Sequence, residues 1–170
     1  MPLYDKLLFS MAFLAAGCDL KMEKIPNEAI WLFWGTGFIY QVLTAGWKGV
    51  GSWLLGAMLP AAALAPLFFF RMTGAGDIKL LSALGGMMGP QTVLKCILVS
   101  FVAGALISAA ILLETGSLII RLRHLAGYFQ KMFQSKTVVP YYQRGKRLEN
   151  IHFSVPVFMA VMLHIGGFYQ

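Results

Sequence analysis

Two aspartates in this sequence follow long apolar stretches, and the residues around them are alike. Residues 19–21 read DLK and residues 77–79 read DIK, so each carboxylate has a lysine two positions further on. An ionisable group at the edge of an apolar segment is costly and usually faces protein or a water-filled interior. If the fold brings Asp19 and Asp77 together in a low-dielectric cleft, they share a proton, and one activates water while the other acts as an acid. The pair therefore predicts the chemistry of an aspartyl protease.

Two glycines immediately precede the second aspartate. Gly74 and Gly76 permit backbone conformations that are closed to other residues, and they leave room for a substrate backbone. We expect them to interrupt the helix before Asp77 and to shape an active-site loop, since irregular backbone at this depth is tolerated mainly beside protein or water. Glycines are common in membrane helices, so these two glycines taken alone are a weak signal. The charge pattern around the two aspartates also leaves a second interpretation open. In that interpretation each aspartate only pairs with nearby lysines at the membrane interface.

The composition indicates that these residues are carried by a membrane protein. The chain is 58% hydrophobic and 12% charged, whereas a soluble domain carries about 25% charged residues. We therefore expect one membrane-embedded domain over residues 1–170. The two cysteines, Cys18 and Cys96, form no C-x-x-C pair, and the histidines lack ligand spacing. We expect no metal site, no disulfide framework and no cofactor.

Long apolar runs predict an all-α, polytopic membrane protein with about six transmembrane helices. The runs are Leu3–Cys18, Ala29–Ala45, Gly51–Phe70, Ile78–Met88, Gln91–Leu113 and Ile151–Phe168. The fourth run is too short to span a bilayer unaided. Gly89 and Pro90 predict the break between the fourth and fifth runs, because proline cannot continue a hydrogen-bonded helix.

The distribution of charge predicts the orientation of these helices. With the N-terminus outside, all but three of the fourteen Lys and Arg residues lie on the inner face, as the positive-inside rule requires. The exceptions are Lys6, Lys48 and Lys95. The net charge of +7 is thereby explained by topology, and we expect no nucleic-acid partner. The first and third runs cross in the same direction, so Asp19 and Asp77 are predicted to meet at the cytoplasmic face.

A basic, polar stretch at residues 115–150 precedes the last apolar run. We expect it to form a cytoplasmic loop. Apolar residues repeat at helical spacing in its first half, which fits an amphipathic helix lying on the lipid headgroups. An inward continuation of the fifth helix fits the same pattern nearly as well.

Two motifs in the chain resemble those of a known family. "GAGDIKLLSALGGMMG" resembles the GxGDxKL…G…G segment of the type IV prepilin peptidases, which are GxGD membrane aspartyl proteases of the A24 type. "DLKMEKIPN", residues 19–27, is similar to the family's other signature, an Asp followed by a basic residue and Ile-Pro-Asn. "HFSVPVFMAVML" resembles the family's closing helix more loosely. In the second motif we expect Pro26 to stiffen the turn and Asn27 to cap the following helix.

The resemblance implies a function and roles for individual residues. It implies that Asp19 and Asp77 are the catalytic pair, at the cytoplasmic face of a prokaryotic inner membrane. It further implies that the substrates are type IV prepilin or pseudopilin precursors, whose short basic leader is removed just ahead of an apolar stem, often after glycine. Lys21 and Lys79 could bias the carboxylates towards ionisation or hold acidic groups of the substrate. Positive-inside anchoring explains these two lysines equally well.

The chain departs from the larger members of that family. It lacks their N-terminal region with paired C-x-x-C motifs, so it resembles the short, peptidase-only members such as those of tight-adherence pilus systems. We therefore expect no N-methyltransferase activity. His152 stands where the family more often has proline or an aliphatic residue, and we expect it to be an interface side chain.

Two other functional classes compete with a peptidase. A small proton-linked transporter would use an aspartate pair, but it should show mid-membrane polar residues and often two related halves. Here the carboxylates lie at the inner edge and the sequence has no evident repeat. A catalytically silent subunit of a pilus or secretion assembly is the other alternative. The presence of both aspartates argues against it.

Overall fold

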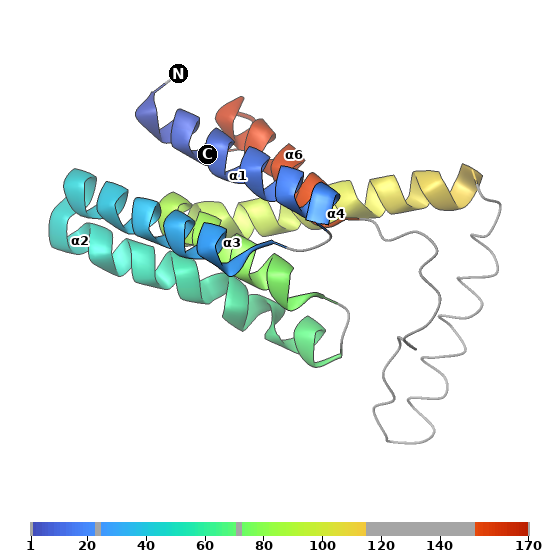
Figure 1. Ribbon diagram of the computed structural model, residues 1–170, viewed down its shortest axis with the longest axis horizontal. Helices are drawn as coiled ribbons and strands as arrows, with labels where there is room; N and C mark the ends of the chain where they lie inside the picture. The colour runs from blue at the N-terminus through green and yellow to red at the C-terminus, as the bar shows by residue number, and fades with distance from the viewer. Residues whose placement is uncertain (1, 23–24, 71–72, 115–151, 170) are drawn as a thin grey trace.

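The computed structural model describes residues 2–22, 25–70, 73–114 and 152–169. In these ranges the chain forms helices and short connections, with no strand, which confirms the all-α prediction. The helices are α1 (Leu3–Met22), α2 (Asn27–Phe69), α3 (Ala75–Met88), α4 (Pro90–Glu114) and α6 (Ser154–Ile165). They pack as a bundle (Figure 1). The predicted basic loop and its amphipathic helix, residues 115–150, lie outside the described residues.

Helix α2 is folded back on itself and contains both the second and the third predicted segments. Its backbone leaves helical geometry at Gly46, where φ is 55° and ψ is −134°, a left-handed region that favours glycine. A first limb (27–45) and a second limb (47–69) therefore run side by side in opposite directions (Figure 1). The Trp53 Nε1 donates a hydrogen bond to the Trp34 carbonyl at 3.3 Å and joins the two limbs.

Helix α3 lies in the centre of the bundle against both limbs of α2. Every residue from Leu80 to Met88 is buried, so the short fourth segment is surrounded by protein rather than exposed. The backbones of Gly56 in α2 and Gly85 in α3 touch directly, and a Cβ atom on either glycine would collide with the carbonyl oxygen of the other. Small residues allow such close contact between membrane helices. This contact holds the second half of α3 close against the second limb of α2.

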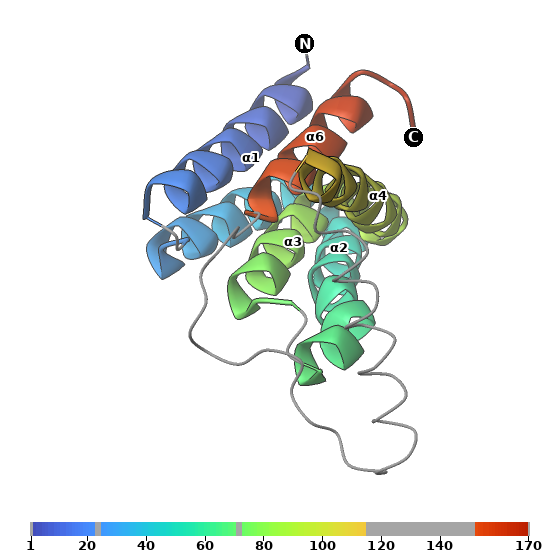
Figure 2. The same cartoon turned by 90° about the vertical axis from the view of Figure 1, so that its right-hand side faces the viewer.

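Helices α1, α6 and α4 complete the bundle (Figure 2). Helix α1 is antiparallel to α6, because Tyr4 at its start contacts His164 near the end of α6, while Asp19 near its end contacts Ser154 at the start of α6. Gly89, with φ at 83°, ends α3 and lets the chain turn sharply into α4. The predicted break between the fourth and fifth segments is confirmed. The end of α1 and the starts of α3 and α6 thus lie at the same end of the bundle.

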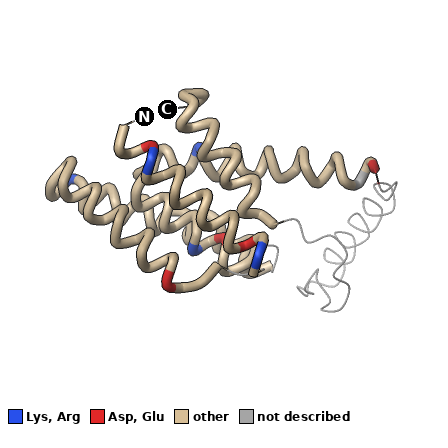
Figure 3. Tube along the Cα trace, turned by 45° about the horizontal axis from the view of Figure 1, so that its top comes forward, with Lys and Arg blue, Asp and Glu red and all other residues tan. Residues whose placement is uncertain are grey.

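Many large apolar side chains lie on the outside of the described part of the bundle. Helix α2, over Asn27–Phe69, and α4, over Pro90–Ile111, are long and apolar enough to cross a membrane. Large apolar side chains are exposed on their outer faces, among them Leu43, Leu98 and Leu106. Charged residues of the described chain lie at or near helix ends and bends (Figure 3). Six crossings and an outside N-terminus stay predictions.

Candidate active site

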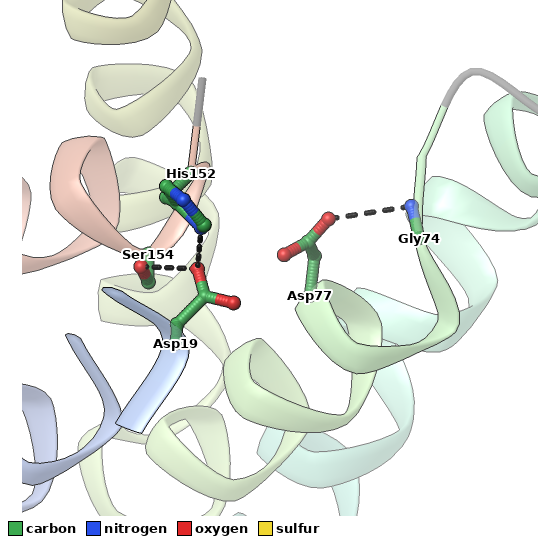
Figure 4. Close-up of polar contacts among 5 residues, drawn as sticks. All are labelled: Asp19, Gly74, Asp77, His152 and Ser154. Atoms are coloured by element: carbon green, nitrogen blue, oxygen red, sulfur yellow. Dashed lines mark hydrogen bonds and ion pairs between the residues drawn. The ribbon is translucent and has the colours of Figure 1, made fainter. Parts of the chain in front are cut away.

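The two aspartates singled out in the sequence face each other at one end of the bundle. Asp19 comes from the last turns of α1 and Asp77 from the first turn of α3. In each carboxyl group one oxygen makes the drawn polar contacts, and the other is directed towards the opposite aspartate (Figure 4). The bundle therefore brings together two carboxyl groups that are far apart in the sequence.

Asp77 is held by the first turn of its own helix. Gly74 is the N-cap residue of α3, and its N–H donates to Oδ2 of Asp77 at 3.3 Å. This is the carboxylate half of a capping box, since glycine has no side chain to complete it. A negative charge in the first turn also interacts favourably with the helix dipole. The local sequence thus fixes the orientation of Asp77 without help from other helices.

Asp19 is held by a different helix. Its Oδ2 accepts a hydrogen bond from Oγ of Ser154 at 2.6 Å, and Nδ1 of His152 lies 3.3 Å from the same oxygen. The side chain of Asp19 is 15% exposed and that of His152 is 24% exposed, so the cluster is largely shielded but still reachable from one side. The start of α6 therefore orients Asp19 from across the bundle.

The environment of Asp77 favours its protonated form. Burial raises the pKa of Asp77 to about 6, the Gly74 N–H opposes this rise, and the negative charge of Asp19 adds to it. Asp77 lies just before the fourth apolar segment and outside both helices that could cross a membrane. A carboxyl group with such a pKa can hold a proton at a pH where an ordinary aspartate has lost it. This is the electrostatic condition for a pair that shares one proton.

The structure does not place either predicted lysine on the carboxylates. Lys79 is exposed, and its Nζ donates to Oδ1 of Asn27 at 3.1 Å, which links the start of α3 to the start of α2. Lys21 is exposed and makes no side-chain hydrogen bond or ion pair with another described residue. Within the described ranges, neither Asp19 nor Asp77 forms an ion pair with a lysine, so the interface-pairing interpretation finds no support there.

The prediction that Asn27 caps the second helix is wrong. The N-cap position of α2 is Pro26, with φ −61° and ψ 139°, and no side chain caps this end. Asn27 is already the first helical residue, so its amide is free to accept the hydrogen bond from Lys79 instead. Asn27 therefore connects two helices rather than ending one.

The two glycines occupy different positions from those expected. Gly74 does end the irregular connection, but Gly76 lies inside α3, which begins at Ala75. The expectation that both glycines interrupt the helix is therefore wrong for Gly76. Both residues are exposed, and a Cβ atom on Gly76 would meet nothing within 4 Å. Gly76 leaves open space on the first turn of α3, one residue from Asp77.

The sequence reasoning missed His152 and Ser154. The expectation that His152 is an interface side chain overlooked its contact with Asp19. A signal was available, because the last apolar run was predicted to start on the same face as both aspartates. Among the residues that the structure describes, no group of three or more His, Cys, Asp or Glu side chains is placed to hold a metal ion.

Comparison with known proteins identifies the family. The model of the type IV leader peptidase family matches residues 6–109, more than half of the chain. The matched range contains Asp19 and Asp77, whereas His152, Ser154 and the rest of α6 lie beyond it. Neither the curated proteins nor the solved structures contain a match to the chain. The extent of the family match shows that this chain belongs to the type IV leader peptidase family.

Proposed function

We propose that this chain is a membrane aspartyl endopeptidase that removes the N-terminal leader of type IV prepilin-like precursors. The observation that carries the proposal is the opposition of the Asp19 and Asp77 carboxyl groups at one end of the bundle (Figure 4). Membership of the leader peptidase family supports the same conclusion from the sequence. The proposed catalytic residues are these two aspartates, and no cofactor takes part.

The proposed reaction uses a single proton shared by the pair. One carboxylate removes a proton from a water molecule that lies between the two aspartates, and the resulting hydroxide attacks the scissile carbonyl. The other aspartate donates its proton to the carbonyl oxygen. The raised pKa of Asp77 supports this scheme, because it keeps one proton in the pair at mildly acidic pH. Two ionised carboxylates could not supply the acid.

The surroundings of the pair suit a peptide that enters from the end of the bundle. Gly74 and Gly76 are exposed beside Asp77, and we assign them to the surface that the substrate backbone approaches. The apolar stem of a precursor can then lie along the apolar outer faces of the helices while its basic leader stays in water. We place this end of the bundle at the cytoplasmic face of a prokaryotic inner membrane, in agreement with the positive-inside rule.

The same site supports a single domain over residues 1–170. Helices α1, α3 and α6 all contribute contacts to the aspartate pair, so none of them can be removed without loss of the site. We propose a peptidase-only activity for this domain, without N-methyltransferase activity. Lys21 and Lys79 are exposed and are assigned to the surface around the site rather than to the reaction.

Co-expression with a prepilin-like precursor tests the proposal. The precursor carries a basic leader, a glycine before the cut and an apolar stem, and its cleavage is followed by the change in size on a gel and by N-terminal sequencing. We expect cleavage by the wild type and loss of cleavage in Asp19→Asn and in Asp77→Asn at equal protein levels. Asp5→Asn is the matched control, because Asp5 lies in the first turn of α1 at the far end of the bundle.

Cleavage that persists in both site variants would exclude the aspartyl mechanism. A wild type that cleaves none of a panel of such precursors would favour the catalytically silent subunit. Comparison of the wild type with the site variants therefore distinguishes the proposed enzyme from its main alternative.

A further inference from the structure

The two carboxyl groups of the pair are held in unequal ways. Oδ2 of Asp19 lies 2.6 Å from the Ser154 hydroxyl and 3.3 Å from Nδ1 of His152. Oδ2 of Asp77 accepts a hydrogen bond from the backbone N–H of Gly74 at 3.3 Å. A short hydrogen bond from a hydroxyl to a carboxylate is a strong, charge-assisted one. Asp19 therefore has better partners for its ionised form than Asp77.

The position of Ser154 at the start of α6 adds to this difference. A serine near a helix start usually accepts a hydrogen bond from the backbone of its own helix. Here the N-cap residue of α6 is Phe153 without a side-chain cap, and the buried Ser154 hydroxyl donates to Asp19 instead. Asp19 thus sits against the N-terminal end of α6, where the helix dipole stabilises a negative charge.

His152 completes the arrangement. Its Nδ1 must carry a hydrogen in order to donate to Asp19, which both the Nδ1–H neutral tautomer and the imidazolium provide. The titratable groups that the described residues bring to Asp19 are His152, in the segment leading into α6, and Asp77, on α3. His152 places its Nδ1 3.3 Å from the carboxylate, where a protonated nitrogen stabilises the negative charge, and Asp77 opposes a second negative charge. Both influences favour one ionised Asp19 beside one protonated Asp77.

We propose that Ser154 and His152 are positioning residues that hold Asp19 as the ionised member of the pair, so that Asp19 is the general base and Asp77 the general acid. The inference rests on the proposed peptidase function and assigns the two roles within it. It concerns a part of the chain beyond the matched family range, which ends at residue 109.

The assignment determines where each proton goes. Ionised Asp19 takes a proton from water as the water oxygen bonds to the scissile carbon, and Asp77 gives its proton to the carbonyl oxygen. The tetrahedral diol then collapses: the C–N bond breaks, and the nitrogen takes the proton now held by Asp19. A hydroxyl proton returns to Asp77, so the products are a carboxylic acid and an amine. Both aspartates end in their starting states.

Paired substitutions separate a positioning role from a merely structural one. Ser154→Ala removes the hydroxyl while Ser154→Thr keeps it, and His152→Leu removes the donor while His152→Asn places an amide N–H near the position of Nδ1. With the precursor above as substrate, we expect Ser154→Ala and His152→Leu to lower kcat roughly tenfold to a hundredfold. KM should stay close to the wild-type value, and Ser154→Thr and His152→Asn should recover most of kcat.

The pH profile supplies a readout that a structural role would not move. Loss of a donor makes the Asp19 carboxylate easier to protonate, so the acidic limb of kcat/KM should move to higher pH in Ser154→Ala and His152→Leu. Ser100→Ala and His164→Leu are the matched controls. Ser100 is a buried serine that donates to the Cys96 carbonyl in α4, and His164 contacts Tyr4 at the far end of the bundle. Neither control substitution should shift the acidic limb of the kcat/KM profile.

A second measurement does not depend on cleavage. The chain contains only three aspartates, Asp5, Asp19 and Asp77, so ¹³C labelling of aspartate carboxyl groups gives three NMR signals, assigned with the Asp→Asn variants. On lowering the pH, Asp77 should protonate before Asp19. The Asp19 signal should titrate at higher pH in Ser154→Ala than in the wild type.

The outcomes separate failure of the inference from failure of the function. If the Asp→Asn variants abolish cleavage but Ser154→Ala and His152→Leu leave kcat and the pH profile unchanged, the positioning role is overturned and the peptidase stands. If Asp19 protonates before Asp77, the assignment of base and acid is overturned. If the wild type cleaves no precursor, the peptidase fails, while the NMR titration still decides which aspartate is held ionised.

Discussion

Oγ of Ser154 lies 2.6 Å from Oδ2 of Asp19, although 135 positions separate the two residues in the sequence. The contact joins the start of the last helix to the end of the first. It means that the orientation of one proposed catalytic carboxylate depends on the folding of the whole chain. A site that could be described by two motifs in the first half of the sequence is completed by the last helix.

The pKa of Asp77 predicts the pH dependence of cleavage. This pKa is raised to about 6, so Asp77 carries its proton below that pH and loses it above. A raised carboxyl pKa means that the acid form is lost as pH rises, and kcat/KM should therefore fall by about tenfold per pH unit above the midpoint. Bound substrate excludes water from the site and favours the neutral form of Asp77 further. The fall in kcat with rising pH should therefore occur at higher pH than the fall in kcat/KM. A kcat/KM that rises steadily from pH 6 to 8 would contradict the role of Asp77 as acid.

Gly76 is predicted to keep a path open for the substrate. A Cβ atom there would meet no protein atom, so Gly76→Leu should leave the melting temperature nearly unchanged. The new side chain would occupy the exposed first turn beside Asp77, and we expect KM to rise roughly tenfold, with a smaller change in kcat. Gly35→Leu is the control, since Gly35 is also exposed and unobstructed but lies within α2. Equal KM values in the two variants would show that substrate does not pass Gly76.

The Lys79–Asn27 hydrogen bond is predicted to support the site rather than to take part in the reaction. The contact is exposed, so its contribution to stability should be less than about 1 kcal/mol. A double-mutant cycle with Lys79→Met and Asn27→Ala should show that the second substitution costs almost nothing once the first is present. Lys21→Met is the control, because Lys21 is exposed and makes no such contact with another residue that the structure describes. A loss of cleavage of a hundredfold or more in Lys79→Met at normal stability would instead assign this lysine to the reaction.

The contact between Gly56 and Gly85 is predicted to determine how closely α3 packs on α2. Gly56→Ala places a Cβ atom against the Gly85 carbonyl, a backbone group that cannot move aside independently. We expect a loss of stability of about 1–3 kcal/mol, measured by thermal or denaturant unfolding in detergent. Gly51→Ala is a matched control in the same limb, with no neighbour within 4 Å. Because alanine favours helix over glycine by about 1 kcal/mol, the control should be neutral or stabilising, and a loss of the same size in both would exclude the packing explanation.

Local features of the sequence were sufficient for the helical class, the main breaks and the two aspartates. Runs of apolar residues predict helices because a backbone in an apolar environment must satisfy its own hydrogen bonds. Gly89 and Pro90 predict the turn between α3 and α4 because their backbone geometry is itself local. Asp77 could also be located, since its cap to Gly74 lies within one helical turn.

The partners of these residues were decided only by the tertiary structure. The sequence predicted neither the hydrogen bond from Ser154 to Asp19 nor that from Lys79 to Asn27, and it misplaced the cap of α2. Such contacts depend on how each helix is rotated about its axis and how closely it packs. Those quantities are set here by pairs such as Gly56 and Gly85, which lie in different helices. The apolar periodicity of a helix predicts that one of its sides is buried. Only the packing of the bundle determines which side chains of other helices that side contacts.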